Sequence, residues 1–210
     1  MQTNWGDRLD VRYYLVNRLS HLQGKKVLDV ACGNGYLLEA LSDSNEKYGI
    51  DESQDAVKES KRRSPKAKVL KASMFKLPFK NDFFDVAIMA NVIPNADFYG
   101  VPEKRRHNQE KAIGEVARVL KKNGVLYLTT PNNAFYKSSK VSFAELDALL
   151  KPWFNYKIKG WNPFPKFPFF LPARVLKHVP GWFSLLRALS EKGLFGKKSK
   201  FFFVEAVKKS

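Results

Sequence analysis

The stretch VLDVACGNGY, residues 27–36, decides the fold of this chain. Its first residues, VLDV, are mostly aliphatic, which is typical of a strand buried on both faces of a parallel sheet. Gly33 and Gly35 end this strand, because glycine permits a tight turn and lets the backbone approach a ligand closely. The helix predicted over 35–43 then points its first N–H groups at that ligand. The stretch therefore predicts a strand, a ligand-binding turn and a helix.

A second acid, Asp51, ends the next predicted strand, residues 47–51. A carboxylate at this place can accept hydrogen bonds from the two vicinal hydroxyls of a ribose, so the ligand is expected to contain adenosine. Two kinds of cofactor use this layout. The dinucleotide fingerprint G-x-G-x-x-G needs a third glycine where Leu38 stands, and this weakens the nicotinamide interpretation.

In these segments the chain resembles class I S-adenosylmethionine-dependent methyltransferases, of the methyltransferase type 11 or quinone-pathway-like branch. Motifs I and II of that family correspond to Asp29, the turn at 31–35 and Asp51. Three later segments follow in the family's order: the adenine-side loop ASMFKLPF (72–79), the motif IV strand FFDVAIMANVIPN (83–95) and the helix–turn–strand EVARVLKKNGVLYLTTPN (115–132). The resemblance covers residues 25–132. It implies S-adenosylmethionine as methyl donor and S-adenosylhomocysteine as product.

The resemblance also assigns the cofactor-binding residues. On the methionine side it implies Asp29, Ala31, Cys32, Gly33, Asn34 and Gly35, with Asn91 in motif IV. On the ribose and adenine side it implies Ile50, Asp51, Glu52, Ser73, Met74 and Phe75. Many members of the family carry aspartate where Ser73 stands, so the adenine amino group is expected to be held less firmly here. For Met74 and Phe75, simple core packing is the alternative.

The end of motif IV departs from its relatives. The segment NVIPN aligns with a Glu-x-x-Glu-His pattern of quinone-pathway O-methyltransferases, and the acids and histidine are replaced by Asn91, Pro94 and Asn95. No metal site is therefore expected there. The segment also differs from the Asn-Pro-Pro-Tyr of adenine N6 methyltransferases, which grips a flipped base. The absence of this motif weakens the hypothesis that the chain methylates an amino group of a nucleic acid.

His107 is the candidate catalytic base. It follows the segment 95–106, which leaves the motif IV strand beside the expected position of the methyl group. A base is needed only when the acceptor must lose a proton, as a phenol or alcohol oxygen does. The alternative is that KRRH, 104–107, merely begins a solvated helix. Other candidate polar groups of the pocket are Tyr13, Tyr14 and Tyr99, and the histidines expected at the surface are His21 and His178.

Composition bounds the class of protein. The chain has 210 residues, 44% of them hydrophobic, which suits a single domain over 1–210 with a full core. It has no apolar run of about 18–20 residues and no charged-then-apolar leader, so neither a membrane span nor a signal peptide is expected. The single cysteine, Cys32, excludes an internal disulfide and is expected to pack rather than to act as a nucleophile. A cytoplasmic enzyme fits these features.

Strands and helices alternate along the chain, which predicts a doubly wound, seven-stranded, mostly parallel sheet of the Rossmann-like methyltransferase type. The last strand is expected to be antiparallel and to follow a C-terminal insert. The predicted helices cover 8–22, 35–43, 53–62, 103–121 and 142–151. The predicted strands cover 26–31, 47–51, 67–71, 84–90, 124–130, 155–161 and 200–208.

The insert, residues 162–199, is basic and aromatic. It follows a strand expected to run parallel to the others, so it leaves from the edge where such sheets bind ligands. Within it one helical face carries Trp182, Phe183, Leu185, Leu186 and Leu189. The insert is expected to form a lid over the substrate, a contact with anionic membrane at the inner face, or both. Contact with nucleic acid is the weaker alternative.

The net charge of +17 is concentrated in the second half of the chain. Together with the motifs, it leads to one functional hypothesis: a methyltransferase acting on a small-molecule or lipid-linked acceptor, at oxygen. The rival hypotheses are an RNA methyltransferase and a catalytically silent module that binds S-adenosylmethionine, both motivated by the charge. Against RNA, the positive charge is interleaved with proline and phenylalanine beside the expected pocket. A silent module would leave the intact glycine turn and ribose acid unexplained.

Overall fold

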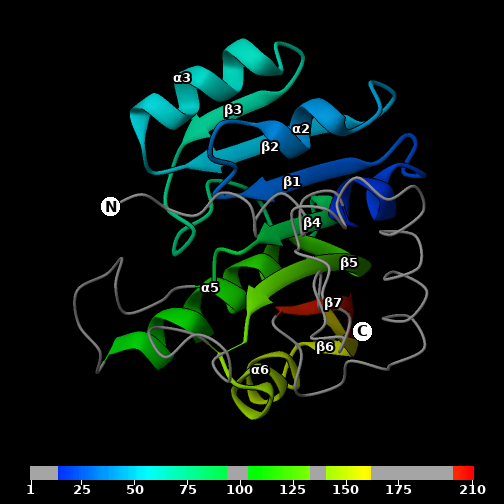
Figure 1. The fold of residues 1–210 in the computed structure, drawn as a ribbon, viewed down its shortest axis with the longest axis vertical. Helices are drawn as coiled ribbons and strands as arrows, with labels where there is room; N and C mark the ends of the chain where they lie inside the picture. Colours follow the sequence, from blue (N-terminus) through cyan, green and yellow to red (C-terminus); the bar gives the residue numbers. More distant parts are fainter. Residues whose placement is uncertain (1–13, 94–103, 133–140, 162–200) are drawn as a thin grey trace, which may run out of the picture.

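The computed structural model describes residues 14–93, 104–132, 141–161 and 201–210. Its centre is a seven-stranded sheet in the order β3-β2-β1-β4-β5-β7-β6 (Figure 1). The strands are β1 Lys26–Val30, β2 Glu46–Asp51, β3 Lys68–Lys71, β4 Phe84–Ala90, β5 Leu120–Pro131, β6 Phe154–Trp161 and β7 Phe201–Lys208. The helices are α2 Tyr36–Ala40, α3 Gln54–Arg63, α5 Arg105–Val119 and α6 Phe143–Leu150, and residues 14–19 are also helical.

Five of the strands, β1 to β5, are mutually parallel. The strand β7 is antiparallel to both of its neighbours, β5 and β6. The strand β6 therefore runs in the same direction as the first five. This confirms the predicted doubly wound, mostly parallel sheet with an antiparallel last strand. The insert at 162–199 joins β6 to β7 and lies outside the described residues.

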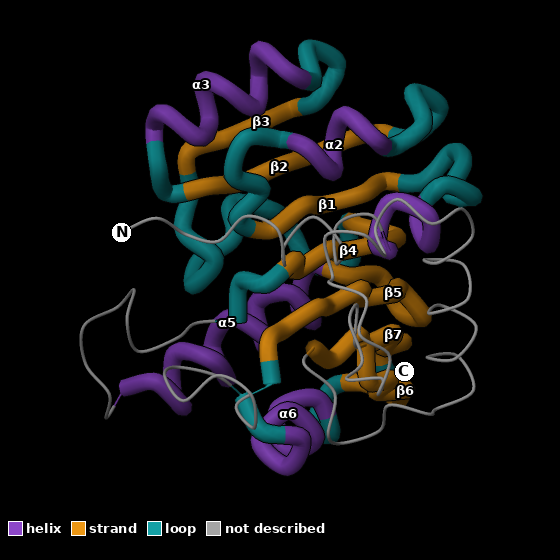
Figure 2. The backbone as a smooth tube through the Cα atoms, viewed as in Figure 1, coloured by secondary structure: helices purple, strands orange, loops and turns teal. Residues whose placement is uncertain are grey.

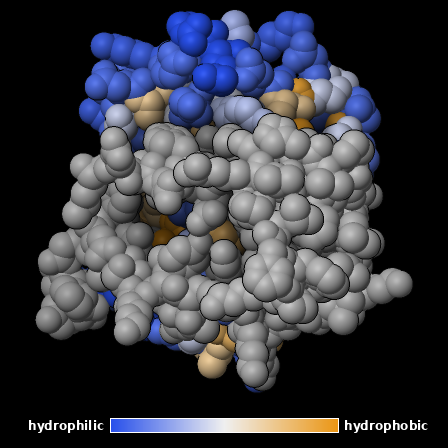
Figure 3. Space-filling model, viewed as in Figure 1, coloured by the Kyte–Doolittle hydropathy of each residue, from blue (hydrophilic) through white to orange (hydrophobic). Residues whose placement is uncertain are grey.

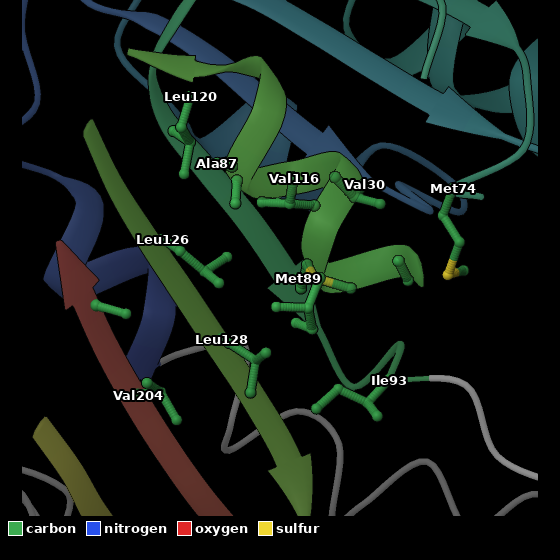
Figure 4. Packing of buried hydrophobic residues seen from close by; sticks show 14 of the residues in the cluster. Val30, Met74, Ala87, Met89, Ile93, Val116, Leu120, Leu126, Leu128 and Val204 are labelled. Carbon is green, nitrogen blue, oxygen red and sulfur yellow. The ribbon is translucent and has the colours of Figure 1, made fainter. Parts of the chain in front are cut away.

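Helices cover both faces of the sheet (Figure 2). One face packs against α2, α3 and the helical segment 14–19, and the other packs against α5 and α6. Because neighbouring side chains of a strand point to opposite faces, Ile88 of β4 joins the first core and Met89 joins the second. Figure 4 shows the second core, with Val116 of α5 against strands β4 and β5.

Several elements differ from the sequence prediction. The first helix ends at 19 rather than at 22, and α5 ends at Val119 rather than at 121. The helix α2 ends at Ala40 rather than at 43, because Leu41 is extended, with ψ 144°, and its carbonyl accepts a hydrogen bond from Lys47 Nζ at 2.9 Å. The strand β5 begins at Leu120, which pairs with Phe84, and regular pairing resumes at Val125 opposite Val86. The extra residues between the two pairs include Asn123 in the left-handed region, φ 63°. Sequence periodicity does not register such a bulge, so the strand was expected to begin at 124.

The helices of the described residues are short, and the longest of them, α5, has 15 residues. Within the described ranges, none combines the length and the apolar character that crossing a bilayer requires. The helices α5 and α6 are joined by an ion pair between Arg105 and Glu145, with 2.5 Å between Nη2 and Oε1. This pair fixes the start of α5 against the start of α6.

Candidate cofactor site

The site lies where the parallel strands β1, β2, β3 and β4 end, at one edge of the sheet. The turn after β1 places Ala31, Gly33 and Gly35 in the left-handed region, with φ values of 55°, 54° and 77°. The N–H of Cys32 donates to the Ile50 carbonyl of β2 at 2.8 Å, which fixes the turn against the neighbouring strand. The backbone thus doubles back within five residues.

The two glycines of this turn have different physical roles. A Cβ on Gly33 would meet no atom of the described residues within 4 Å. A Cβ on Gly35 would lie 2.5 Å from Ser60 Oγ and 2.9 Å from Ser60 Cα, because α3 packs directly on the turn. Gly33 therefore leaves the room that a ligand needs for close approach, whereas Gly35 allows the helix to pack.

The carboxylate of Asp51 is held in place by two backbone groups. Its Oδ2 accepts from the Gly33 N–H and its Oδ1 accepts from the Ser53 N–H, each at 2.9 Å. An ionised carboxylate has about four acceptor positions, so two remain for a ligand. Asp51 is only partly buried, and Glu52 beside it is exposed. The acid is thus pre-oriented next to the open side of Gly33, as recognition of a ribose requires.

Cys32 and Asp29 are buried beneath the turn. The Cys32 thiol is 8% exposed and lies 3.7 Å from Ser60 Oγ, and a Cβ on Gly49 would meet its sulfur at 3.0 Å. Burial raises the pKa of this thiol to about 12. The position agrees with the expected packing role, and it leaves the backbone of Cys32 to line the turn. Asp29, at 2% exposure, lies inside β1.

The adenine-side loop is packed into the core at one residue and open at its neighbours. Met74 is 5% exposed and belongs to the cluster that contains Val30, Met89 and Ile93, as Figure 4 shows. Phe75 and Ser73 are half-buried. The N–H of Phe75 donates to Ser73 Oγ at 3.3 Å, so the Ser73 hydroxyl supports its own turn. Ile50 is fully buried, and its side chain belongs to the core.

A charged clamp on α5, which sequence reasoning missed, holds the adenine-side loop. Arg118 donates to the Leu77 carbonyl at 3.0 Å and to the Phe79 carbonyl at 2.8 Å. Glu115 Oε2 accepts from the Leu77 N–H at 2.7 Å and also pairs with Arg118. The hydrogen bond from Arg118 lowers the pKa of Glu115, and the same bond raises the pKa of Arg118. The i, i+3 spacing of Glu115 and Arg118 is visible in the sequence, but the sequence does not indicate that they bind the loop at Leu77 and Phe79.

Asn91 follows β4 in the left-handed region, φ 59°. Its N–H donates to the Thr129 carbonyl at 2.9 Å, and the Thr129 hydroxyl donates to its Oδ1 at 3.3 Å. Thr129 is buried on β5, opposite Ala90. Asn91 is therefore fixed at the same edge as the β1 turn, with its side-chain carbonyl turned toward β5. Thr129 is a second residue that the motifs did not indicate.

The structure gives His107 no direct contact with the cofactor-site residues that it describes. His107 is exposed in the first turn of α5, and Arg105 and Arg106 beside it both bind Glu145 of α6. In the described ranges, no hydrogen bond joins His107 to Asp51 or Asn91. Tyr14 is 5% exposed and packs edge-to-face on Phe203, so it belongs to the core; His21 is exposed. The remaining candidates, Tyr13, Tyr99 and His178, and the motif residues Pro94 and Asn95, lie outside the described residues.

The residues of this edge fit S-adenosylmethionine. Gly33 has no described atom within 4 Å of an added Cβ, Asp51 presents a fixed carboxylate, and Asn91 is held at the end of β4. No cluster of three or more His, Cys, Asp or Glu side chains suited to a metal ion occurs in the described part of the chain. The arrangement can therefore bind an adenosine-containing ligand through its ribose and hold the attached group over the ends of β1 and β4.

Known proteins share this architecture. The fold is similar to the crystal structure of the N-methyltransferase NodS from Bradyrhizobium japonicum in complex with S-adenosyl-L-homocysteine. The TM-score is 0.64, and the match covers 98% of this chain and 90% of that one, at 12% identity. At this level of identity the likeness concerns the fold.

Two curated relatives match in sequence. A probable S-adenosylmethionine-dependent methyltransferase of Mycolicibacterium smegmatis is 26% identical over 138 residues, which is 65% of this chain and 49% of the relative. The ubiquinone/menaquinone biosynthesis C-methyltransferase UbiE of Campylobacter jejuni is 29% identical over 109 residues, 48% of this chain and 42% of the relative. The chain thus spans about half the length of these relatives.

The family model for a methyltransferase domain matches residues 21–192. This match covers the glycine turn, Asp51, the adenine-side loop and motif IV. It confirms the resemblance seen in the sequence, the enzyme class that it implied and S-adenosylmethionine as the cofactor of the domain. The chain belongs to the S-adenosylmethionine-dependent methyltransferase family.

Proposed function

We propose that the protein transfers the methyl group of S-adenosylmethionine to an oxygen atom of a small or lipid-linked acceptor. The observation that carries the methyl-transfer part is the hydrogen bond from the Gly33 N–H to Asp51 Oδ2, at a glycine that no described atom crowds. This is a ribose-binding acid built next to a close-approach turn. The acceptor part is supported by the sequence of the motif IV end and by the insert at 162–199.

The cofactor supplies a methyl group on a sulfonium, a strong electrophile. Its displacement neutralises a positive charge, so the protein has no need of an oxyanion hole. The contribution of the chain is orientation: Asp51 fixes the ribose, and the turn at 31–35 fixes the methionine end. Positioning of this kind can supply about 7–11 kcal/mol of the barrier. The hydrogen bonds from the Cys32 N–H to the Ile50 carbonyl and from the Gly35 N–H to the Cys32 carbonyl keep the turn in place.

An oxygen acceptor must also lose a proton. His107 is the proposed general base, and it is exposed in the first turn of α5. The test is the His107→Ala variant with an identified acceptor. A base contributes about 10²–10⁴ in kcat, with cofactor affinity changed only a few-fold. A loss in kcat below tenfold would mean that His107 is a surface residue and not the base.

A second candidate reaction is methylation at carbon. It is favoured by the similarity to UbiE, whose name describes a C-methyltransferase of ubiquinone and menaquinone biosynthesis. A ring carbon next to a hydroxyl becomes nucleophilic when that hydroxyl ionises, so both reactions use a phenol-like acceptor. They differ in the product, because a new methyl ether and a new ring methyl give different carbon chemical shifts.

The insert at 162–199 is proposed to cover the acceptor or to contact anionic lipid. If lipid contact holds, the protein co-sediments with anionic vesicles more than with neutral ones, and salt weakens the binding. Trp182→Ser with Phe183→Ser then abolishes co-sedimentation. If the insert is only a lid, the wild type ignores vesicles and the double variant chiefly raises the KM for the acceptor.

The deciding experiment is a methyl-transfer screen with isotope-labelled donor over pools of quinols, phenols, sugar-linked lipids and RNA. The Asp51→Ala variant serves as the control for transfer that does not depend on the site. We expect label in a quinol, phenol or lipid pool, and nuclear magnetic resonance of the product then assigns oxygen or carbon. Label in the RNA pool alone would contradict the proposal, and S-adenosylhomocysteine binding without transfer would favour the silent module.

A further inference from the structure

The edge of the sheet opposite the cofactor site is lined with lysines. Parallel strands begin at this edge, and β7, being antiparallel, ends there. We call it the lysine edge and define it by six exposed lysines that flank strand ends: Lys25, Lys68, Lys80, Lys122, Lys151 and Lys209. They precede or begin β1, β3, β4, β5 and β6, or follow β7. The fold thus collects at one edge residues that are scattered over the sequence.

Hydrogen bonds and ion pairs between the strand ends show that these segments are neighbours. The N–H of Lys26 donates to Asp85 Oδ2 at 2.8 Å, which joins the starts of β1 and β4. Lys208 Nζ binds Asp82 and the Leu120 carbonyl, which joins the end of β7 to the starts of β4 and β5. The N–H of Lys209 donates to the Trp153 carbonyl at 2.9 Å and brings in β6. The Glu46 N–H donates to the Lys25 carbonyl at 2.9 Å and Lys68 Nζ donates to the Tyr48 hydroxyl at 3.3 Å, which add β2 and β3. The lysine edge is therefore one continuous surface.

The acids of this surface are already neutralised. Each of these acids forms an ion pair with a neighbouring cation. The pairs are Asp43 with Lys47 and with Lys66, Glu46 with Lys26, Asp82 with Lys208, Asp85 with Lys121, and Glu115 with Arg118. In the described ranges none of the six lysines that define the edge has an ion-pair partner. Lys68 and Lys80 instead lie over the rings of Tyr48 and Phe83, at 5.1 and 5.5 Å. The edge carries an uncompensated positive charge.

An exposed aromatic ring lies at one end of this surface. Trp153, immediately before β6, is 45% exposed between Lys151 and the chain at Lys209. Its ring lies beside Gly114 of α5, where a Cβ would approach within 3.6 Å. The other large exposed hydrophobic side chain of the described residues, Leu70, is on β3, at the far side of the sheet. The exposed apolar groups are thus single and widely separated.

We propose that the lysine edge binds the phosphate backbone of a single-stranded nucleic acid, with Trp153 stacking on an unpaired base. Lysines are point charges suited to phosphates without sequence readout, and an exposed indole gives a stacking platform. Such binding holds the protein on a nucleic acid while the cofactor edge, at the opposite ends of the strands, remains free. The nucleic acid then localises the protein and need not be the methyl acceptor.

A flat membrane fits this surface less well. Neighbouring strands are about 4.8 Å apart and turned by about 20–25° from each other, so the edge spans about 29 Å and rotates by on the order of 120–150° across seven strands. A flexible strand can follow such a turn, whereas a bilayer contacts only part of it. Docking here would also turn the cofactor edge away from the bilayer, and two isolated apolar side chains do not form an insertion patch.

The test compares two triple variants with the same change of charge. In the edge variant, Lys25, Lys122 and Lys151 become glutamine. In the control variant, the exposed helix lysines Lys58, Lys61 and Lys111 become glutamine. Like the edge lysines, these three have no ion pair within the described residues. The surface over α3 is as hydrophilic as the rest of that end of the molecule (Figure 3). The probe is a fluorescent oligouridylate of about 20 nucleotides, with oligothymidylate of the same length to compare RNA with DNA.

Counterion release from three phosphate contacts contributes about 2 to the slope of log K against log salt concentration, and it raises the affinity about 100-fold at about 0.1 M salt. We expect the edge variant to lose this slope and this affinity, and the affinity of the control variant to fall less than about threefold. Trp153→Leu should weaken binding by about 5- to 150-fold and Trp153→Phe should largely restore it. Affinity for S-adenosylhomocysteine should be unchanged in all of them, which separates this proposal from the methyltransferase assignment.

Three results would overturn the proposal. Equal losses in the two triple variants would mean that the total charge, or the insert at 162–199, binds the oligonucleotide. Wild type that does not bind oligouridylate at low salt would leave the edge without this partner. Binding to anionic phosphatidylglycerol vesicles that the edge variant loses, with no loss of oligonucleotide binding, would assign the surface to a membrane instead.

Discussion

Gly35 lies directly against Ser60 of α3, so that a Cβ on Gly35 would come within 2.5 Å of the Ser60 hydroxyl. Ser60 itself is fully buried and lies 3.7 Å from the Cys32 sulfur. The cofactor turn is thus shaped from behind by a helix as well as by its own glycines. The motif residue that looks most like a ligand contact, Gly35, is required by packing.

Alanine substitutions of Gly35 and Gly33 should therefore affect different properties of the protein. Gly35→Ala combines left-handed strain of about 1–2 kcal/mol with overpacking of about 1–3 kcal/mol, so the free energy of unfolding should fall by several kcal/mol. Gly33→Ala should cost only the strain, because its Cβ meets no described atom within 4 Å, yet it should reduce affinity for S-adenosylhomocysteine by placing a methyl group on the cofactor turn. Urea denaturation and calorimetry measure the two effects. Similar stability losses in both variants would contradict this division of roles.

Asp51→Ala should weaken S-adenosylhomocysteine strongly. Loss of a charged hydrogen bond to the ribose is expected to cost about 1.5–3 kcal/mol, about 10- to 150-fold in affinity. The variant also frees the N–H groups of Gly33 and Ser53, which adds to the loss. Glu52→Gln, a change at the exposed neighbour, is the control. NAD should give no comparable heat, and an Asp51→Ala variant with unchanged affinity would remove the basis of the site assignment.

The sequence was sufficient for the sheet, because aliphatic runs alternate with helical segments, and a glycine turn and an acid mark the ends of the first two runs. The direction of β7 and the place of the insert also followed, since the family resemblance orders the segments. For the candidate site, the turn at 31–35, Asp51 and the loop at 72–79 were identified, and the first two are brought together by a hydrogen bond. These features depend on residues that are close in the chain.

Contacts between distant segments could not be predicted. Arg118 reaches the carbonyls of Leu77 and Phe79, about forty positions earlier, and nothing in the local pattern names that partner. The Thr129 hydroxyl that orients Asn91 comes from the adjacent strand and depends on the register of β4 and β5. The six lysines of the lysine edge are likewise collected by topology alone. One-dimensional patterns specify periodicity and turns, whereas these pairings require the sheet order.

Glu115→Gln should loosen the adenine-side loop and reduce stability by about 1–3 kcal/mol near neutral pH. The pKa of Glu115 is lowered below its ordinary value of 4.5, first by the hydrogen bond from Arg118. A lowered pKa stabilises the fold above the ordinary value, and that contribution is lost as pH falls through the lowered one. The difference between wild type and Glu115→Gln should therefore be full near neutral pH and shrink as the pH falls below 4.5 and through the lowered pKa. Urea denaturation over a series of pH values tests it, and a difference that is constant with pH would contradict the clamp.

Cys32 should resist alkylation in the folded protein. Burial raises the pKa of its thiol to about 12, so very little thiolate is present near pH 8. Iodoacetamide should modify native protein at least about 100-fold more slowly than protein unfolded in urea, with mass spectrometry as the readout. Methyl transfer should survive the exposure of native enzyme to the reagent. Rapid modification of the native chain together with loss of S-adenosylhomocysteine binding would place the thiol in the site.

The position of β7 has a consequence for how the chain is made. Of the seven strands of this sheet it is synthesised last, and it sits between β5 and β6 in the finished sheet. Until it emerges from the ribosome, β5 and β6 have no common neighbour, and each shows an unpaired edge of the kind that attracts other chains. Translation must therefore pass Lys208 before this half of the sheet can close. A nascent chain stalled before Phe201 would carry an intact ribose-binding half beside two exposed strand edges, and chaperones would meet it in that state.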